Sequence, residues 1–165
     1  MKIIIRAAVV AGLVLVVWWA GSVIFRNPKT EIRQRLNELA KIASFDAKEQ
    51  PGAKLYNASK VSTFFANSLE LKVNVPGVGE HTFEGHDEIV QAALAARNTL
   101  ATLQVRLNDP NIELLPDKQG AVVDLNVSGD VNGEKNAILQ EMKFSFKKIG
   151  GDWLITRVES VKTLR

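Results

Sequence analysis

The sequence predicts an α+β domain in which a strongly bent, mostly antiparallel sheet covers about three helices, preceded by one transmembrane helix. Three observations favour this architecture. Residues 136–162 read as two long strands joined at Gly150-Gly151, apolar residues recur at helical spacing between residues 27 and 71, and residues 7–25 carry no charge. An isolated hairpin of this length is marginal in water, so other elements must cover its apolar face. No repeat or internal linker interrupts the 165 residues, which indicates a single domain.

Residues 7–25 predict a transmembrane signal anchor. These 19 residues carry no charge and lie between Arg6 and Arg26. At about 1.5 Å per helical residue they span about the 30 Å hydrocarbon core of a bilayer. A cleaved signal peptide has a shorter apolar core and small residues at its cleavage site, where this chain has Trp18 and Trp19. We therefore expect an uncleaved anchor, with residues 1–6 as a short tail and residues 26–165 as the globular domain.

Basic residues flank the predicted anchor on both sides, so their distribution alone does not orient it. A very short tail followed by a whole globular domain is the usual layout of a signal anchor. We expect the tail in the cytoplasm and the domain on the other side of the membrane.

The formal net charge of +3 lies in the N-terminal segment. Lys2, Arg6 and Arg26 precede all other charged residues, which leaves 18 of the 21 basic residues against all 18 acidic ones. A nucleic-acid-binding domain carries an excess of Lys and Arg, so the neutral domain argues against a nucleic-acid partner. The absence of cysteine excludes disulfides, thiol chemistry and thiolate metal sites.

Two helical segments are predicted first. Asn27 is suited to cap a helix whose first residue is Pro28. Apolar residues then follow at spacings of three and four, at Ile32, Leu36, Leu39, Ile42 and Ala43. The stretch 48–52, which contains Pro and Gly, ends this helix, and residues 55–71 predict a second one.

A short hairpin is predicted next, from strands 71–75 and 81–83 joined by a Pro- and Gly-containing turn. A third helix begins within residues 85–89, with His86 or Asp87 near its N-terminal cap and Glu88 in its first turn, where the helix dipole favours an acidic group. Residues 103–107, 112–115 and 121–131 predict further strands.

The last two strands leave one question of register open. If Gly150-Gly151 forms a plain two-residue turn, Phe144 lies opposite Arg157, and Met142 lies opposite Glu159 on the apolar face. One bulge would reverse the second strand and bring the side chains of a different set inward: Leu154, Thr156 and Val158.

A histidine- and acid-containing cluster and a single tyrosine are the candidates for chemistry. His81, Glu84, His86 and Asp87 carry metal-ligating atoms, but their spacing matches no regular zinc pattern, so we interpret them as helix-capping and surface residues and expect no metal. The single tyrosine, Tyr56, is interpreted as a half-buried packing residue rather than as a general acid.

The order of elements and two motifs resemble the nuclear transport factor 2-like superfamily, including its polyketide cyclase-like branch. The motifs are Gly85-His-Asp-Glu-Ile89 and Gly151-Asp-Trp-Leu-Ile155, the latter followed by Val158-Glu-Ser160. The resemblance covers residues 30–164. It implies a cone-shaped fold with a pocket in the cone and frequent dimerisation through the sheet.

The resemblance does not by itself choose a function, because the superfamily holds both enzymes and binding proteins. Its epoxide-hydrolase-like members use an Asp, Arg and Asp cluster, which Asp124, Arg157 and Glu159 would imitate only if they pointed inward. Its steroid-isomerase-like members use a tyrosine and acidic groups, to which Tyr56 does not align. The candidate pocket residues are Gln140, Met142, Phe144, Arg157 and Glu159.

The layout also resembles single-pass bacterial inner-membrane proteins, including a component of type IV secretion machinery, in which a cone-shaped domain is an assembly surface. We therefore expect a membrane-anchored, non-catalytic module in the periplasm that binds a partner protein or a small apolar ligand without a cofactor. The expected protein partner is a second copy of the chain or a subunit of a membrane complex. The alternative is an isomerase, hydrolase or cyclase that acts in the cone pocket.

Overall fold

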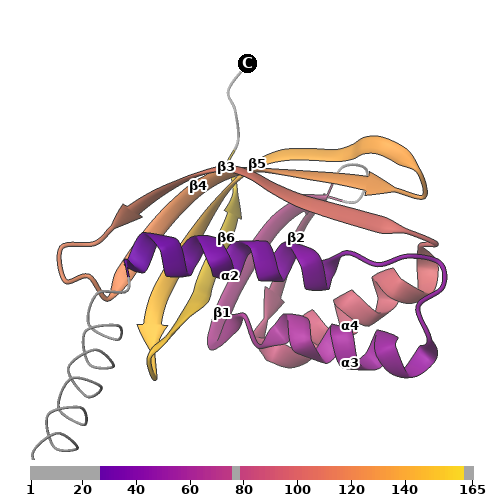
Figure 1. Ribbon diagram of the computed structural model, residues 1–165, viewed down its shortest axis with the longest axis horizontal. Coiled ribbons are helices and arrows are strands. Elements are labelled where there is room, and N and C mark those ends of the chain that lie inside the picture. The colour runs from indigo at the N-terminus through magenta and orange to yellow at the C-terminus, as the bar shows by residue number, and fades with distance from the viewer. Residues whose placement is uncertain (1–26, 76–78, 162–165) are drawn as a thin grey trace, which may run out of the picture.

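The computed structural model describes residues 27–75 and 79–161 (Figure 1). The predicted tail and anchor at residues 1–25 therefore lie outside the described residues. Within the described part of the chain, no helix is both long enough and apolar enough to cross a membrane. The elements in chain order are α2 (Pro28–Ala43), α3 (Pro51–Ser62), β1 (Phe65–Val75), β2 (Gly79–Glu84), α4 (Gly85–Thr99), β3 (Leu103–Leu114), β4 (Gly120–Val131), β5 (Glu134–Ile149) and β6 (Asp152–Ser160).

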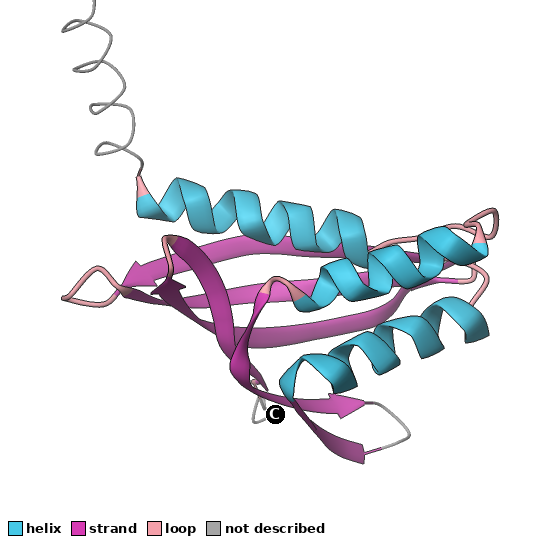
Figure 2. Cartoon of the chain, turned by 90° about the horizontal axis from the view of Figure 1, so that it is seen from below, coloured by secondary structure: helices cyan, strands magenta, loops and turns pink. Residues whose placement is uncertain are grey.

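The strands form one six-stranded sheet in the order β2-β1-β6-β5-β4-β3. Strands β1 and β6 are parallel, and the other neighbouring strands are antiparallel. The sheet curves, and the three described helices lie on its inner side (Figures 1 and 2). The predicted architecture of a bent, mostly antiparallel sheet over three helices is thus confirmed for the described residues.

The first helix begins as predicted. The backbone amide of Lys29 donates to the side-chain oxygen of Asn27 over 3.0 Å, and Pro28 occupies the first turn. The apolar stripe faces the sheet, where Ile32 and Leu36 are fully buried. The helix ends at Ala43, however, five residues before the predicted stop, because the backbone of Phe45 leaves the helix to pair with Leu103 at the start of β3.

The second helix is shorter than predicted. Helix α3 ends at Ser62, and the segment from Phe65, predicted as helix, belongs to β1. The carbonyl of Phe64 accepts a hydrogen bond from the amide of Ile155 over 2.9 Å, and Phe65 then pairs with Ile155 in the parallel β1–β6 ladder. Apolar spacing alone could not reveal a partner that lies ninety residues away in the sequence.

The third helix begins at Gly85, whose φ of +78° favours glycine. Its N-cap residue is Glu84 rather than His86 or Asp87. The carboxylate of Glu88, in the first turn as predicted, accepts the backbone amide of Glu84 over 2.7 Å and so satisfies one unpaired donor at the helix start.

The β5–β6 hairpin combines both predicted registers. Near its turn the strands pair as a plain two-residue turn requires, with Phe146 opposite Ile155. A bulge at Thr156 then shifts the register by one residue, so that Phe144 faces Val158 instead of Arg157. Trp153, Ile155 and Val158 therefore point inward, whereas Leu154 does not, because the bulge follows Leu154 instead of preceding it.

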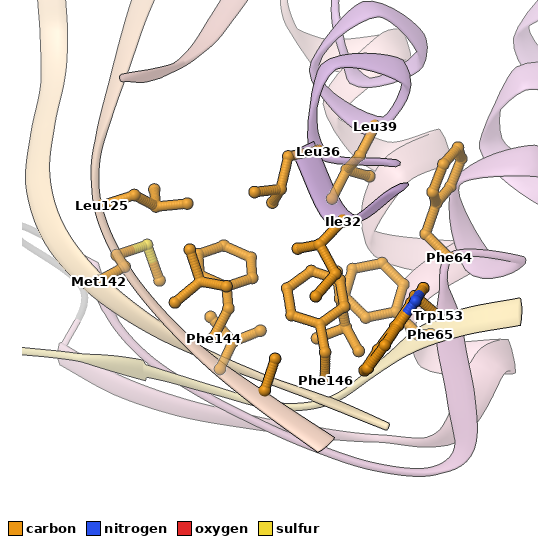
Figure 3. Close-up of a cluster of buried hydrophobic side chains, with 14 of the residues drawn as sticks. Ile32, Leu36, Leu39, Phe64, Phe65, Leu125, Met142, Phe144, Phe146 and Trp153 are labelled. Carbon is orange, nitrogen blue, oxygen red and sulfur yellow. The ribbon is translucent and has the colours of Figure 1, made fainter. Parts of the chain in front are cut away.

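The core lies between the inner face of the sheet and the helices (Figure 3). Phe144 and Phe146 from β5 are 5% and 3% exposed and pack with Trp153 from β6 and with Ile32 and Leu36 from α2. Further buried members of the same cluster are Leu39, Val61, Phe64, Phe65, Leu69, Ile89, Ile112, Ala121, Val123, Leu125, Met142, Ile155 and Val158. The space between α2 and the sheet is thus filled with apolar side chains.

Replacing Phe144 or Phe146 with alanine should lower the free energy of unfolding by about 3 to 5 kcal/mol, because each change empties a large volume in this core. Lys147→Ala is the matched control on the same strand, since this residue is exposed, and it should change stability by less than about 0.5 kcal/mol. Urea unfolding of residues 27–165 followed by circular dichroism measures both. Equal losses for Phe144→Ala and Lys147→Ala would contradict the packing described above.

Candidate functional site

The five predicted pocket residues do not converge. Met142 and Phe144 are buried members of the core, and Gln140 is half-buried on the same face of β5. Arg157 and Glu159 lie on the opposite, outer face, where they form an ion pair with an Nε–Oε1 distance of 3.1 Å. Their side chains are 44% and 40% exposed. The bulge at Thr156 is the cause, because it places both residues opposite the outward-facing Ser145 and Lys143.

A row of alternating charges crosses this outer face. Lys72 on β1 pairs with Glu159 on β6, Glu159 with Lys143 on β5, and Lys143 with Asp124 on β4. The ammonium of Lys143 lies 3.4 Å from a carboxylate oxygen of Asp124. Leu71 packs against the core, so its neighbour Lys72 points outward. We name Lys72, Glu159, Lys143 and Asp124 the outer charge row.

The hydrolase-like cluster considered from the sequence does not enter the cone. Asp124 and Glu159 belong to the outer charge row, and Arg157 lies beside it on the same face. Sequence alternation had already placed Asp124 opposite the apolar side of β4, but the orientation of Arg157 and Glu159 depended on the bulge.

The residues weighed as metal ligands are also dispersed. His86 Nε2 lies 2.7 Å from the carbonyl oxygen of Phe65, to which it donates, while Glu84 and Asp87 are exposed. The side chain of His81 lies outside what the structure describes. Across residues 27–75 and 79–161, no three His, Asp or Glu side chains gather where they could hold a metal ion. Tyr56 is 64% exposed on α3, rather than half-buried as predicted.

A cleft of about 600 Å³ opens where α3 passes into β1. It forms because β1 leaves the β6 ladder between Phe65 and Glu70, so that four residues of β1 lie opposite the single residue Thr156. We name it the α3–β1 cleft. Its lining includes Arg35, Phe65, His86, Ile149, Asp152 and Leu154. Sequence reasoning missed this cleft, since it arises from a gap in parallel pairing that no local pattern records.

Two basic side chains of the α3–β1 cleft are held in place by the protein. The Nε of Arg35 donates to the carbonyl oxygen of Trp153 over 3.3 Å, and its guanidinium lies 4.9 Å from the centroid of the Phe64 ring. Among the described residues, neither Arg35 nor His86 hydrogen-bonds to a hydroxyl or carboxylate side chain. The cleft combines polar and apolar side chains, and among the described residues no hydrogen-bonded pair of nucleophile and base lies in it.

A buried ion pair links the α2–α3 loop to helix α4. The Nε of Arg97 on α4 lies 3.2 Å from a carboxylate oxygen of Glu49, and the two side chains are 2% and 9% exposed. Arg97 Nη2 also donates to the carbonyl oxygen of Ile42, and Asn57 Nδ2 donates to Glu49 over 2.6 Å. The pair joins the α2–α3 loop to α4 and is structural. No local pattern in the sequence marks it, because its two partners lie far apart in the chain.

A second charged contact fixes the far end of the outer face. Arg106 on β3 donates two hydrogen bonds to Asp130 on β4, over 2.8 and 2.7 Å, and the amide of Asn136 donates a third over 2.8 Å. The hydrogen bond from Arg106, followed by that from Asn136, holds the pKa of Asp130 well below its ordinary value. The same Asp130 hydrogen bond raises the pKa of Arg106.

Comparisons with known proteins find similarity in structure only. No protein-family model and no curated protein matches the sequence. The yeast UBP3-associated protein BRE5 matches with a TM-score of 0.62 and 12% identity, over 84% of this chain and 99% of its own. A Nostoc punctiforme protein of unknown function with a cystatin-like fold matches with a TM-score of 0.58 and 18% identity, over 82% of this chain and 92% of its own. A proposed scytalone dehydratase from Novosphingobium aromaticivorans matches with a TM-score of 0.59 and 13% identity, over 82% and 84%.

At such low identity these likenesses show the fold alone. The similar structures have the cystatin-like or nuclear transport factor 2-like fold, which agrees with the fold implied by the sequence motifs. They include both a proposed dehydratase and proteins of unknown function, so the fold does not select a function.

Arg157→Ala and Glu159→Ala should each shift the melting temperature by no more than a few degrees, because both side chains are about half exposed and solvent screens their interaction. Glu49→Ala is the matched comparison, since it leaves Arg97 as an unpaired buried charge and should cost about 3 to 5 kcal/mol. Thermal melts of residues 27–165 measure all three. A large loss of thermal stability in both outer-face variants would contradict the exposed position of Arg157 and Glu159.

Asp130 should make stability depend on pH. Its folded-state pKa lies below the unfolded value of about 4, so its contribution is present above that pH and is lost as the pH falls through the folded-state pKa. Asp130→Asn should therefore be less stable than the wild type at pH 7, and the difference should narrow toward pH 2.5. Urea midpoints at both pH values test this, and a constant difference would refute it.

Proposed function

We propose that this chain is a membrane-tethered, non-catalytic assembly module that self-associates through the outer face of its sheet. The observation that carries the proposal is the outer charge row, in which positive and negative side chains alternate across four adjacent strands. Adjacent strands lie about 4.8 Å apart, so the row is about 14 Å long, which suits a small and specific contact surface.

The outer charge row is complementary to a second copy of itself. In a two-fold symmetric dimer whose axis runs perpendicular to the row, the outer charge row faces itself in the reverse direction. From Lys72 to Asp124 the charges are plus, minus, plus and minus, and in the reversed row of the second copy each of them meets the opposite charge. Lys72 of each copy faces Asp124 of the other, and Glu159 of each copy faces Lys143 of the other. Complementary charges of this kind set the orientation and register of an interface.

The interior of the domain supports a non-catalytic role. The buried side chains between α2 and the sheet are apolar, and the buried polar residues of the described chain are Ser62, Arg97 and Ser128. Arg97 is engaged by Glu49 and Ile42. An enzyme acting in the cone would need an acid, base or nucleophile directed into it. The enzyme alternative therefore has weaker support than assembly.

The membrane tether is supported by the sequence. Residues 7–25 form an uncharged run long enough to span a bilayer, and the first described helix begins only three positions later, at Pro28. The proposed orientation places the domain in the periplasm of a bacterial inner membrane. One similar structure is named for association with another protein and another for a reaction, so the choice between roles rests on this chain's own residues.

Substitutions that exchange charges within the outer charge row test self-association. Lys143→Glu or Glu159→Lys alone sets like charges against each other twice in the dimer and should weaken it about tenfold or more. The double exchange gives plus, plus, minus, minus, which is again complementary to its own reverse, and should restore dimerisation. Sedimentation of the full chain in mild detergent measures each state, with Lys41→Glu, an exposed change on α2, as the control. A monomeric wild type, or a double exchange as weak as the single changes, would refute the interface.

The tether predicts that the mature protein keeps Met1 or Lys2 at its N-terminus and stays with membranes through a carbonate wash, because an uncleaved spanning helix is not extracted at high pH. Mass spectrometry of the membrane fraction identifies the N-terminus. A mature chain that begins beyond Ala20 would show cleavage instead.

A further inference from the structure

Three segments meet at the end of the domain where the described chain begins. They are the first turn of α2, the β3–β4 turn at residues 115–119 and the β5–β6 turn at Gly150-Gly151. The amide of Lys148 donates to the carbonyl oxygen of Gln119 over 2.8 Å, which joins the two turns. The indole of Trp153 donates to Glu31 over 3.0 Å, which joins the second turn to α2. Figures 1 and 2 both show this end, which we name the proximal end.

The proximal end must lie close to any membrane that holds residues 7–25. Only Arg26 and Asn27 separate Phe25, the last residue of the apolar run, from Pro28, the first residue of α2. Three residue steps reach at most about 11 Å even when fully extended. The headgroup layer on one side of a bilayer is about 5 to 7 Å thick. The tether therefore cannot hold the proximal end far beyond the headgroups.

Both turns of the proximal end expose a branched aliphatic side chain. Leu115 is 45% exposed, and it lies against Gly120, where a Cβ would collide with it. Ile149 is 42% exposed and directly precedes the turn glycines. Nearby lysines, Lys118 and Lys148, provide cations of the kind that accompany apolar residues at anionic lipid surfaces.

Acidic groups at the proximal end would oppose contact with an anionic lipid surface, but most of them are engaged within the protein. Glu31 binds Trp153 and lies 3.7 Å from the ammonium of Lys148, and Asp117 accepts the amide of Gln119 over 2.9 Å. Asp152 is exposed and lies on the cleft side of the β5–β6 turn. Two of the three carboxylates are thus engaged within the protein.

We propose that the proximal end is a second membrane contact, in which Leu115 and Ile149 enter the headgroup region of the bilayer that holds the anchor. The occupant is the phospholipid interface rather than another protein, because the tether length brings lipid to this surface. The inference rests on the membrane tether of the proposed function. It adds that the domain is held against the bilayer in one orientation.

The absence of cysteine makes a direct test possible. Leu115→Cys and Ile149→Cys in the full chain provide single sites for an environment-sensitive fluorophore. Leu139→Cys is the matched control, because Leu139 is 71% exposed on β5, ten residues from Ile149. At about 3.3 Å per strand residue, this separates the two labels by about 33 Å. The proteins are reconstituted into phosphatidylcholine–phosphatidylglycerol vesicles that contain nitroxide-labelled lipid.

The labels at positions 115 and 149 should be quenched at least about twofold more than the label at 139, which lies beyond the interfacial layer. Leu115→Asp should reduce quenching of the label at 149. Equal quenching at all three sites, in protein that resists carbonate extraction, would overturn the docking proposal and leave the tether intact. Release of the protein by carbonate would instead overturn the tether and the docking proposal together. Circular dichroism confirms that each variant is folded.

Discussion

The packing of the β5–β6 hairpin against α2 is the contact on which the rest of the structure depends. Phe144, Phe146 and Trp153 meet Ile32 and Leu36 in a single apolar cluster. Burial of such side chains contributes about 1.5 to 3 kcal/mol each, far more than an exposed charge pair. Because this packing occupies the inner face, the charged residues of the same strands must lie on the outer face. The apolar interior and the charged outer face thus both follow from the alternation of inward and outward side chains along these strands.

The bulge at Thr156 keeps that alternation consistent along the whole hairpin. Near the turn, Trp153 and Ile155 face inward, and a regular strand would then carry Arg157 and Glu159 inward as well. One extra residue returns Val158 to the core and moves both charges outward. Without the bulge, burial of two charged groups would oppose packing of the cone. The hydroxyl of Thr156, which donates to the carbonyl oxygen of Ser145 over 3.2 Å, helps to hold the irregular backbone.

The two proposed surfaces would reinforce each other. Exposed charge pairs contribute at most about 1 kcal/mol each, so the outer charge row alone supports only a weak dimer. Tethering both copies to one membrane raises their effective concentration, and a fixed orientation removes part of the rotational freedom that association costs. A weak but register-specific face is then sufficient for assembly.

Local patterns in the sequence determined the elements whose signals are contained within a few residues. The cap at Asn27, the apolar stripe of α2 and the alternation of β5 are of this kind, and so is the neutral charge of the domain. Only the tertiary structure decided features that join distant residues. The pairing of Phe65 with Ile155 converted a predicted helix into a strand, and the Glu49–Arg97 pair formed between the α2–α3 loop and α4. The register beyond Thr156 also belongs here, because a bulge is selected by which side chains fill the core and not by the residues that form it.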